Sequence, residues 1–114
     1  LIQKQLSKIK YHSFVEVFGL NTSDAEDILN RAKELTNKFS SSSITPHAPY
    51  SLSLKLMTLV NQESDSLMTI HNQETPSENE LFKNGSGALF NQLSKFSEEI
   101  KTWQPTEKTS LQSY

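Results

Sequence analysis

Apolar residues recur at helical spacing in one long stretch near the start of the chain. The apolar positions are Ala25, Ile28, Leu29, Ala32 and Leu35. Residues three and four positions apart share one face of an α-helix, so the spacing predicts an amphipathic helix over residues 24–38. Ser23 and Glu26 stand at its beginning with the spacing of a capping box, which supports a helix start at this point.

Three short stretches have the apolar, β-branched or aromatic composition that is typical of strands. The first covers residues 9–18, with its core at 14–18, and the second is Ile44-Thr45, which the prolines of the segment 46–50 bring to an end. The third is Leu67–Ile70, which reads as a short buried strand. A helical pattern follows each of them, and this βα-βα-βα order implies a parallel sheet in an α/β fold.

Capping signals divide the second half of the chain into helices. Ser51 or Ser53 caps a helix that carries apolar residues to position 60, and Thr75, Pro76 and Glu78 suit the N-cap, first position and capping box of another. Glu78 is interpreted as a capping or solvated charge, as are Glu80, Asp24 and Glu26. Further helices are expected at residues 1–6, after Ser86 and from Ser110, and Asn84-Gly85 is a helix stop signal.

The composition indicates a thin hydrophobic core. Of the 114 residues, 34% are apolar, and even with the 3 glycines this is below the fraction of about 45–50% in ordinary globular domains. The chain starts with leucine, so we expect it to begin inside a longer protein that supplies some of the missing burial. The net charge of −2 argues against a nucleic-acid partner, and no apolar run approaches the roughly 20 residues of a membrane helix. The absence of cysteine fits a cytoplasmic protein.

Two of the three histidines follow predicted strands. His47 comes just after the second strand and His71 at the end of the third, whereas His12 lies early in the first and is interpreted as structural or exposed. The carboxyl ends of parallel strands meet at one edge of a sheet, about 4.8 Å apart, so the two side chains can converge on a ligand or a metal. The alternative is a pair of buried histidines satisfied by local carbonyl groups.

Two carboxylates accompany these histidines. Glu74 lies three residues after His71, where it could act as general base and then general acid beside a metal-bound water, or simply favour the dipole of the following helix. Glu16 stands inside the first predicted strand, where a buried charge needs a partner, so we expect it to face a polar interior.

The two histidine segments together resemble the amidohydrolase superfamily. The segment TPHAPYS at 45–51 and the segment TIHNQET at 69–75 are similar to a proline-histidine-x-proline-tyrosine-serine loop and a strand ending in histidine-x-x-glutamate-threonine. The similarity is greatest to the branch of cytosine, guanine and methylthioadenosine deaminases and chlorohydrolases, and it extends from about residue 9 to the chain end. It implies a metal-dependent hydrolase of carbon–nitrogen bonds on a (β/α)8 TIM barrel.

The resemblance also assigns roles to three residues. His71 matches a metal ligand for one divalent ion, Zn or Fe, Glu74 the catalytic acid/base, and His47 a histidine that contacts the substrate, an N-heterocycle or amide. The paired first-strand histidines and the sixth-strand histidine have no match, and no eighth-strand aspartate can be identified. Residues 1–114 therefore resemble a partial barrel, about strands 3 to 5, that is inactive alone and partners the rest of the barrel or a second copy. A non-catalytic fragment or interaction module with structural histidines is the alternative.

Overall fold

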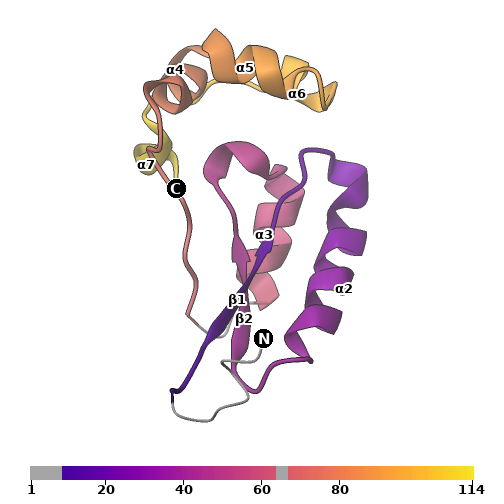
Figure 1. Ribbon diagram of the computed structural model, residues 1–114. Helices are drawn as coiled ribbons and strands as arrows, with labels where there is room; N and C mark the ends of the chain where they lie inside the picture. The colour runs from indigo at the N-terminus through magenta and orange to yellow at the C-terminus, as the bar shows by residue number, and fades with distance from the viewer. Residues whose placement is uncertain (1–8, 64–66) are drawn as a thin grey trace.

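A two-stranded parallel sheet lies at the centre of the computed structural model, which describes residues 9–63 and 67–114. The strands are β1 (Ser13–Val17) and β2 (Ser42–Pro46), in register so that Val15 lies opposite Ile44. The helices α2 (Ala25–Thr36) and α3 (Leu54–Glu63) pack against each other and against the sheet (Figure 1). The predicted parallel α/β arrangement is thereby confirmed for this part of the chain.

The hydrophobic core lies between the sheet and these two helices. Its buried members come from β1, from α2, and from α3 with the residues just before it: Val17, Ala25, Leu29, Ala32, Leu52, Leu56 and Val60. The apolar face that the sequence predicts for residues 24–38 is the face that enters this core, and the α-helix itself ends at Thr36. Burial of such side chains stabilises a fold by roughly 25 cal/mol per Å² of apolar surface.

The capping box predicted at the start of α2 does not form. The short 3-10 helix η1 (Thr22–Asp24) leads into α2, and the Ser23 hydroxyl donates to the Asp24 side chain instead of capping. Glu26 lies 2.7 Å from the Lys55 ammonium of α3, and this ion pair lowers the pKa of its carboxyl. Ser23 itself lies inside η1, and the N-cap of α2 is Asp24, so Glu26 stands at the second helical position and not at the third, where a capping box needs it.

The third predicted strand is wrong as a hydrogen-bonded strand, although its segment runs in parallel beside β2. Side-chain hydroxyls of β2 take the place of the backbone ladder. The Thr45 hydroxyl donates to the Thr69 carbonyl and accepts from the Thr69 amide at 2.8 Å. The Ser43 hydroxyl donates to the Leu67 carbonyl at 2.6 Å. Segment 67–71 is therefore extended and aligned with β2, yet it is exposed where a buried strand was expected.

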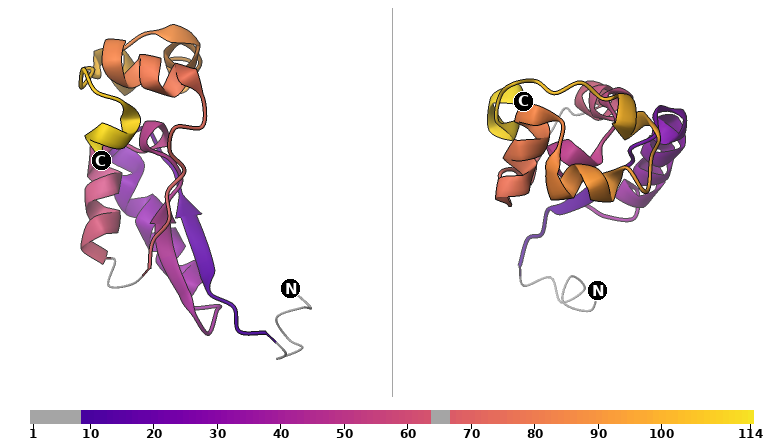
Figure 2. Two further views of the ribbon diagram at one scale, coloured as in Figure 1. Left: turned by 90° about the vertical axis from the view of Figure 1, so that its left-hand side faces the viewer. Right: turned by 90° about the horizontal axis from the view of Figure 1, so that it is seen from above.

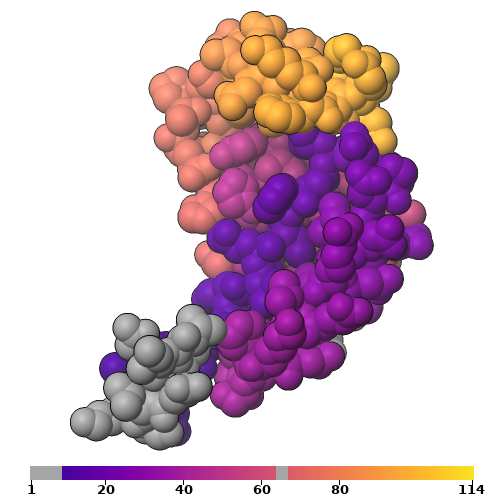
Figure 3. Space-filling model, turned by 45° about the vertical axis from the view of Figure 1, so that its right-hand side comes forward, coloured from indigo at the N-terminus to yellow at the C-terminus, as the bar shows by residue number. Residues whose placement is uncertain are grey.

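A second layer of short helices covers the carboxyl end of the sheet. It contains α4 (Pro76–Asn84), α5 (Gly87–Leu93), α6 (Glu99–Thr102) and α7 (Ser110–Ser113). Figures 1 and 2 show these helices above the strands, and Figure 3 shows the continuous cap that they form over the indigo and purple layer. The predicted stop at Gly85 is confirmed, because this residue ends α4 in the left-handed conformation with a φ of 63°.

Hydrogen bonds tie the helical cap to the lower layer at two places. The Glu99 carboxylate accepts from the backbone amide of Thr22 at 2.9 Å and from its hydroxyl at 2.6 Å. The Ser97 hydroxyl donates to the Asn21 side chain at 2.6 Å. These bonds hold the cap over the turn that leaves β1, so the end of the sheet is enclosed from above.

The sheet face opposite α2 carries exposed apolar side chains. Phe14 and Phe18 project from it with exposed fractions of 39% and 69%. Among the described residues, β1 pairs only with β2, so the other edge of β1 has no neighbouring strand. The helix predicted at residues 1–6 lies outside the described part of the chain. Within residues 9–63 and 67–114, no helix combines the length and the apolar character that crossing a membrane requires.

Candidate functional site at the carboxyl edge of the sheet

His47 and His71 lie side by side where β2 and its neighbouring segment end. The backbone amide of His47 donates to the Val17 carbonyl at 3.0 Å, and that of His71 donates to the His47 carbonyl at 2.9 Å. These two bonds place the residues at the same level along the sheet, and the centroids of their rings are 5.3 Å apart. The structure thus brings together the two histidines that the sequence placed at one edge.

Glu74 reaches back from the following loop to this pair of histidines. One carboxylate oxygen accepts from the Tyr50 hydroxyl at 2.6 Å, and the other lies 3.7 Å from Nδ1 of His71. Burial raises the pKa of Tyr50 to about 12, and the hydrogen bond to Glu74 adds to the effect. Tyr50 is therefore a protonated donor at neutral pH, and it holds Glu74 at the histidine edge.

Glu16 belongs to the same cluster, which the sequence did not predict. Its carboxylate lies 3.2 Å from Nε2 of His71, across the open face of the sheet. Strand alternation places Glu16 on the face opposite the buried Val17, and its side chain is 43% exposed there. The partner expected for this charge is present, whereas its burial in a polar interior stays a prediction. The partner itself lies 55 residues away in sequence, and no local pattern connects the two.

His47 is held in one orientation by the short 3-10 helix η2 (Pro49–Ser51). Its Nδ1 lies 3.0 Å from the Ser51 hydroxyl, and that hydroxyl donates its own proton to the Ala48 carbonyl. With the Ser51 proton on the Ala48 carbonyl, Nδ1 of His47 is the donor in this contact, and that tautomer carries a lone pair on Nε2. Among the described residues, Nε2 has no hydrogen-bond partner. His47 thus offers an acceptor at the edge where Glu74 and His71 meet.

His12 lies at the opposite end of the strands. Its two ring nitrogens each lie 2.8 Å from a serine hydroxyl, Nδ1 from Ser41 and Nε2 from Ser43. The ring also packs edge-on against Phe14. These contacts lie away from the histidine edge, and His12 is exposed, so it fits the interpretation of a structural or exposed residue.

The loop between His71 and α4 has an unusual backbone. Gln73 adopts a φ of 57°, a left-handed backbone conformation that residues other than glycine rarely take. The loop continues to Thr75, the N-cap of α4, whose side chain makes no capping hydrogen bond. The predicted box between Thr75 and Glu78 is therefore wrong. Glu78 instead accepts from the Glu74 amide at 2.9 Å and is completely buried, not solvated.

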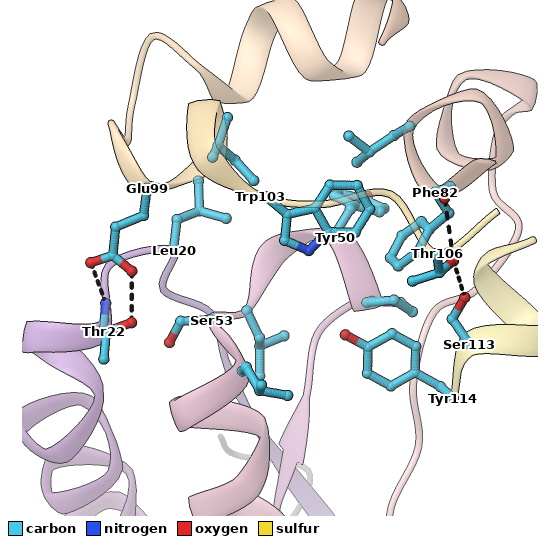
Figure 4. A pocket seen from close by; sticks show the side chains of 15 residues that line it. Leu20, Thr22, Tyr50, Ser53, Phe82, Glu99, Trp103, Thr106, Ser113 and Tyr114 are labelled. Carbon is cyan, nitrogen blue, oxygen red and sulfur yellow. Dashed lines mark hydrogen bonds between the residues drawn. The ribbon is translucent and has the colours of Figure 1, made fainter. Parts of the chain in front are cut away.

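A cavity of about 420 Å³ lies between the helical cap and the carboxyl end of the sheet (Figure 4). Tyr50 is part of its wall, so the cavity adjoins the residue that holds Glu74. The other aromatic residues in the wall come from the cap: Phe82, Trp103 and Tyr114. Its volume falls within the range of about 300–1,000 Å³ that small-molecule pockets have.

The described residues provide only part of a metal site. His71 and Glu16 present a nitrogen and an oxygen at 3.2 Å, both suitable zinc or iron ligands. A catalytic zinc site usually has three protein ligands, and within residues 9–63 and 67–114 no group of three or more suitable side chains comes together. A metal at this edge would need additional ligands.

Comparison with protein-family models, with curated proteins and with the solved structures finds no match to this chain. The candidate site therefore stands on its geometry and on the two sequence segments that form it.

Proposed function

We propose that this chain is the central part of a metal-dependent hydrolase that acts on carbon–nitrogen bonds other than peptide bonds, with deaminase-like chemistry. The observation that carries the proposal is the position of Glu74, whose carboxylate lies between His71 and Tyr50 at the carboxyl edge of the sheet. His47 and His71 reach the same edge from neighbouring segments, as in the resemblance to amidohydrolases. In βα architectures, this edge is where catalytic side chains gather.

The side chains have separate tasks in this proposal. Glu74 is partly exposed, so it can take a proton from a nucleophilic water and pass it to the departing nitrogen. Tyr50 keeps the carboxylate oriented, and Nε2 of His47 can accept from an N–H or O–H group of an N-heterocyclic or amide substrate. A divalent zinc or iron ion, held partly by His71, would supply a water of lowered pKa.

The architecture proposed for the whole protein is a (β/α)8 barrel. In a closed barrel the sheet face opposite α2 would point inward, and the unpaired edge of β1 would join another strand. The exposed Glu16 and Phe18 on that face are then interior residues. This placement accounts for the polar contact between Glu16 and His71 on an otherwise open surface.

The test is the Glu74→Gln variant of the protein as its gene encodes it. Ammonia release from methylthioadenosine, guanine and cytosine is measured together with bound zinc and iron. Turnover should fall by at least about 100-fold, in line with the loss of a general acid/base, while the metal content stays the same. Glu80→Gln, on the exposed side of α4, is the matched control and should behave as wild type. Activity equal to wild type in Glu74→Gln would remove the proposed role.

An interaction module without catalysis is the second candidate, and the exposed Phe14 and Phe18 on the sheet face favour it. The gene distinguishes the two. A reading frame with about 250 or more further residues and a histidine-x-histidine pair near its start supports the hydrolase. A reading frame that encodes only these 114 residues supports the interaction module.

A further inference from the structure

Glu78 is a carboxylate that the proposed reaction does not use, yet it is among the most deeply buried side chains of the molecule. It belongs to the first turn of α4 and has no exposed surface. Among the described residues, its Oε1 has no hydrogen-bond partner, whereas Oε2 accepts from the Glu74 amide at 2.9 Å. Buried carboxylates are costly and are normally held by several partners, so this one calls for a role.

The bond that Glu78 makes serves the loop and not the helix. A capping-box glutamate accepts from the backbone of the N-cap residue, which is Thr75 in α4. Glu78 reaches one residue further back, to Glu74, and so binds the loop outside the helix. This loop contains Gln73 in its left-handed conformation, and such a backbone persists only where its surroundings fix it.

A second buried residue, in α7 of the helical cap, bonds to the same loop. Ser110, the first residue of α7, is completely buried and donates its hydroxyl proton to the Asn72 side chain at 2.9 Å. Its backbone amide donates to the Asn79 side chain at 3.3 Å, which links α7 to α4. The loop 71–74 is thus fixed from α4 through Glu78 and from α7 through Ser110.

We propose that Glu78 is a positioning residue for Glu74, a role that rests on the proposed function. Its carboxylate fixes the Glu74 backbone, and this directs the Glu74 side chain toward His71 and Tyr50. Glu78 touches neither substrate nor metal in this arrangement. Ser110 supports the loop from the other side, so the two ends of the helical cap jointly set the geometry of the carboxylate that handles the proton.

The first experiment measures the hydrogen bond itself, independently of activity. Amide hydrogen exchange of Glu74 is followed in the protein as its gene encodes it, in wild type, Glu78→Ala and Glu78→Gln. The hydrogen bond to the Glu78 side chain is lost in Glu78→Ala, so exchange at Glu74 should accelerate on the order of 10- to 100-fold. Glu78→Gln keeps a neutral acceptor of the same shape and should give an intermediate rate.

Leu81→Ala is the control for a general loss of stability. Leu81 lies on the same helix and is also buried, but its apolar side chain cannot accept a hydrogen bond from the Glu74 amide. If Leu81→Ala accelerates exchange at Glu74 as much as Glu78→Ala does, the effect is global and the proposal is wrong. Unchanged exchange at Glu74 in both Glu78 variants overturns it as well. Glu78→Gln preserves the side-chain shape, so the test remains decisive if Glu78→Ala does not fold.

The second experiment measures turnover of methylthioadenosine, guanine and cytosine. Misplacement of a catalytic group by about 1 Å can cost about 100-fold, so kcat in Glu78→Ala should fall by that order. Glu78→Gln should recover most of the loss. If Glu74→Gln is inactive and Glu78→Ala is fully active, the positioning role of Glu78 is overturned, but the proposed function is not. Active Glu74→Gln would remove the proposed function, and the exchange experiment would still decide whether Glu78 fixes the loop.

Discussion

At the scale of single residues, the candidate site depends on polar side chains whose partners lie far away in sequence. Tyr50 reaches Glu74 over 24 positions, and His71 reaches Glu16 over 55. Each of these contacts joins a residue of β1 or η2 to a residue of the segment that leads into α4. The chemistry of the site is therefore set by the way the elements are stacked at the carboxyl edge.

Tyr50 gives the site a measurable pH signature. Folding raises the pKa of Tyr50 from 10.0 to about 12, first through burial and then through the hydrogen bond to Glu74. The stabilisation linked to the protonated hydroxyl is complete below pH 10 and is lost as the pH rises toward about 12, because the unfolded state releases its proton first. Tyr50→Phe should show a shallower loss of stability over this interval than wild type.

The measurement is the denaturant midpoint of wild type and Tyr50→Phe at several pH values between about 9 and 11.5. Lysines and the other tyrosines titrate in both proteins, so only the difference between the two curves reports on Tyr50. Parallel curves over the whole interval would show that folding does not shift the Tyr50 hydroxyl.

The surroundings of Glu78 and Glu16 were predicted less well from the sequence than the positions of His47 and His71. Strand ends can be located from local patterns, so two histidines after predicted strands could be placed at a common edge. The partner of a carboxylate depends on three-dimensional packing. Glu78 has the spacing of a capping residue, but the loop before α4 offers it the amide of Glu74 instead of that of Thr75.

At the scale of the elements, segment 67–71 is unusual because side-chain hydroxyl groups, and not backbone groups, bond it to β2. The segment is aligned with β2, because Ser43 bonds to Leu67 and Thr45 bonds to Thr69, and both pairs are 24 residues apart in sequence. Hydroxyl groups bridge the two segments in place of amide-to-carbonyl bonds, and backbone bonding resumes only at His71. The position of His71 relative to His47 therefore depends on two small polar side chains of β2.

Thr45→Val tests this dependence. Valine has the shape of threonine but cannot donate to the Thr69 carbonyl or accept from its amide. The free energy of unfolding should fall by about 1–3 kcal/mol, as expected for two lost hydrogen bonds at a buried side chain, and exchange of the Thr69 amide should accelerate. Chemical denaturation and amide exchange provide these two values.

Thr58→Val is the matched control for this substitution. The Thr58 hydroxyl donates to the Leu54 carbonyl within α3 and is exposed, so its loss should change stability by no more than about 0.5 kcal/mol. Equal effects of the two variants, or unchanged exchange at Thr69, would show that the hydroxyl of Thr45 does not hold the segment.

At the scale of the whole molecule, apolar side chains and one edge of β1 are uncovered by any of the residues 9–63 and 67–114. Phe14 and Phe18 lie on the open sheet face, and Phe96 and Leu54 are exposed elsewhere. Unpaired strand edges invite association with another chain, and contiguous apolar surface favours it. We expect the purified 114-residue chain to self-associate at micromolar concentration. Sedimentation with mass spectrometry measures this, and a cooperatively folding monomer of 12.9 kDa would contradict it.

The incomplete set of metal ligands leads to a second prediction at this scale, which concerns the affinity of the chain for zinc. His71 and Glu16 alone cannot build a closed coordination sphere, so the 114-residue chain should bind Zn²⁺ weakly or not at all. Titration calorimetry with ZnCl₂ gives the affinity, and His71→Ala shows whether any binding involves this edge. A sub-micromolar one-to-one affinity that His71→Ala abolishes would mean that further ligands complete the site.

The sequence by itself determined the helices of the lower layer, the stop at Gly85, the parallel order of the first two strands and the common edge of His47 and His71. These features follow from hydrophobic periodicity, from the residues that end helices and from the alternation of strands and helices along the chain. All three can be recognised from a few neighbouring residues. Only the tertiary structure decided that hydroxyl groups hold segment 67–71, that Glu16 meets His71 and that Glu78 is buried against the Glu74 amide. Those contacts join residues through packing, because the geometry of a loop or a sheet face determines which polar group is within reach.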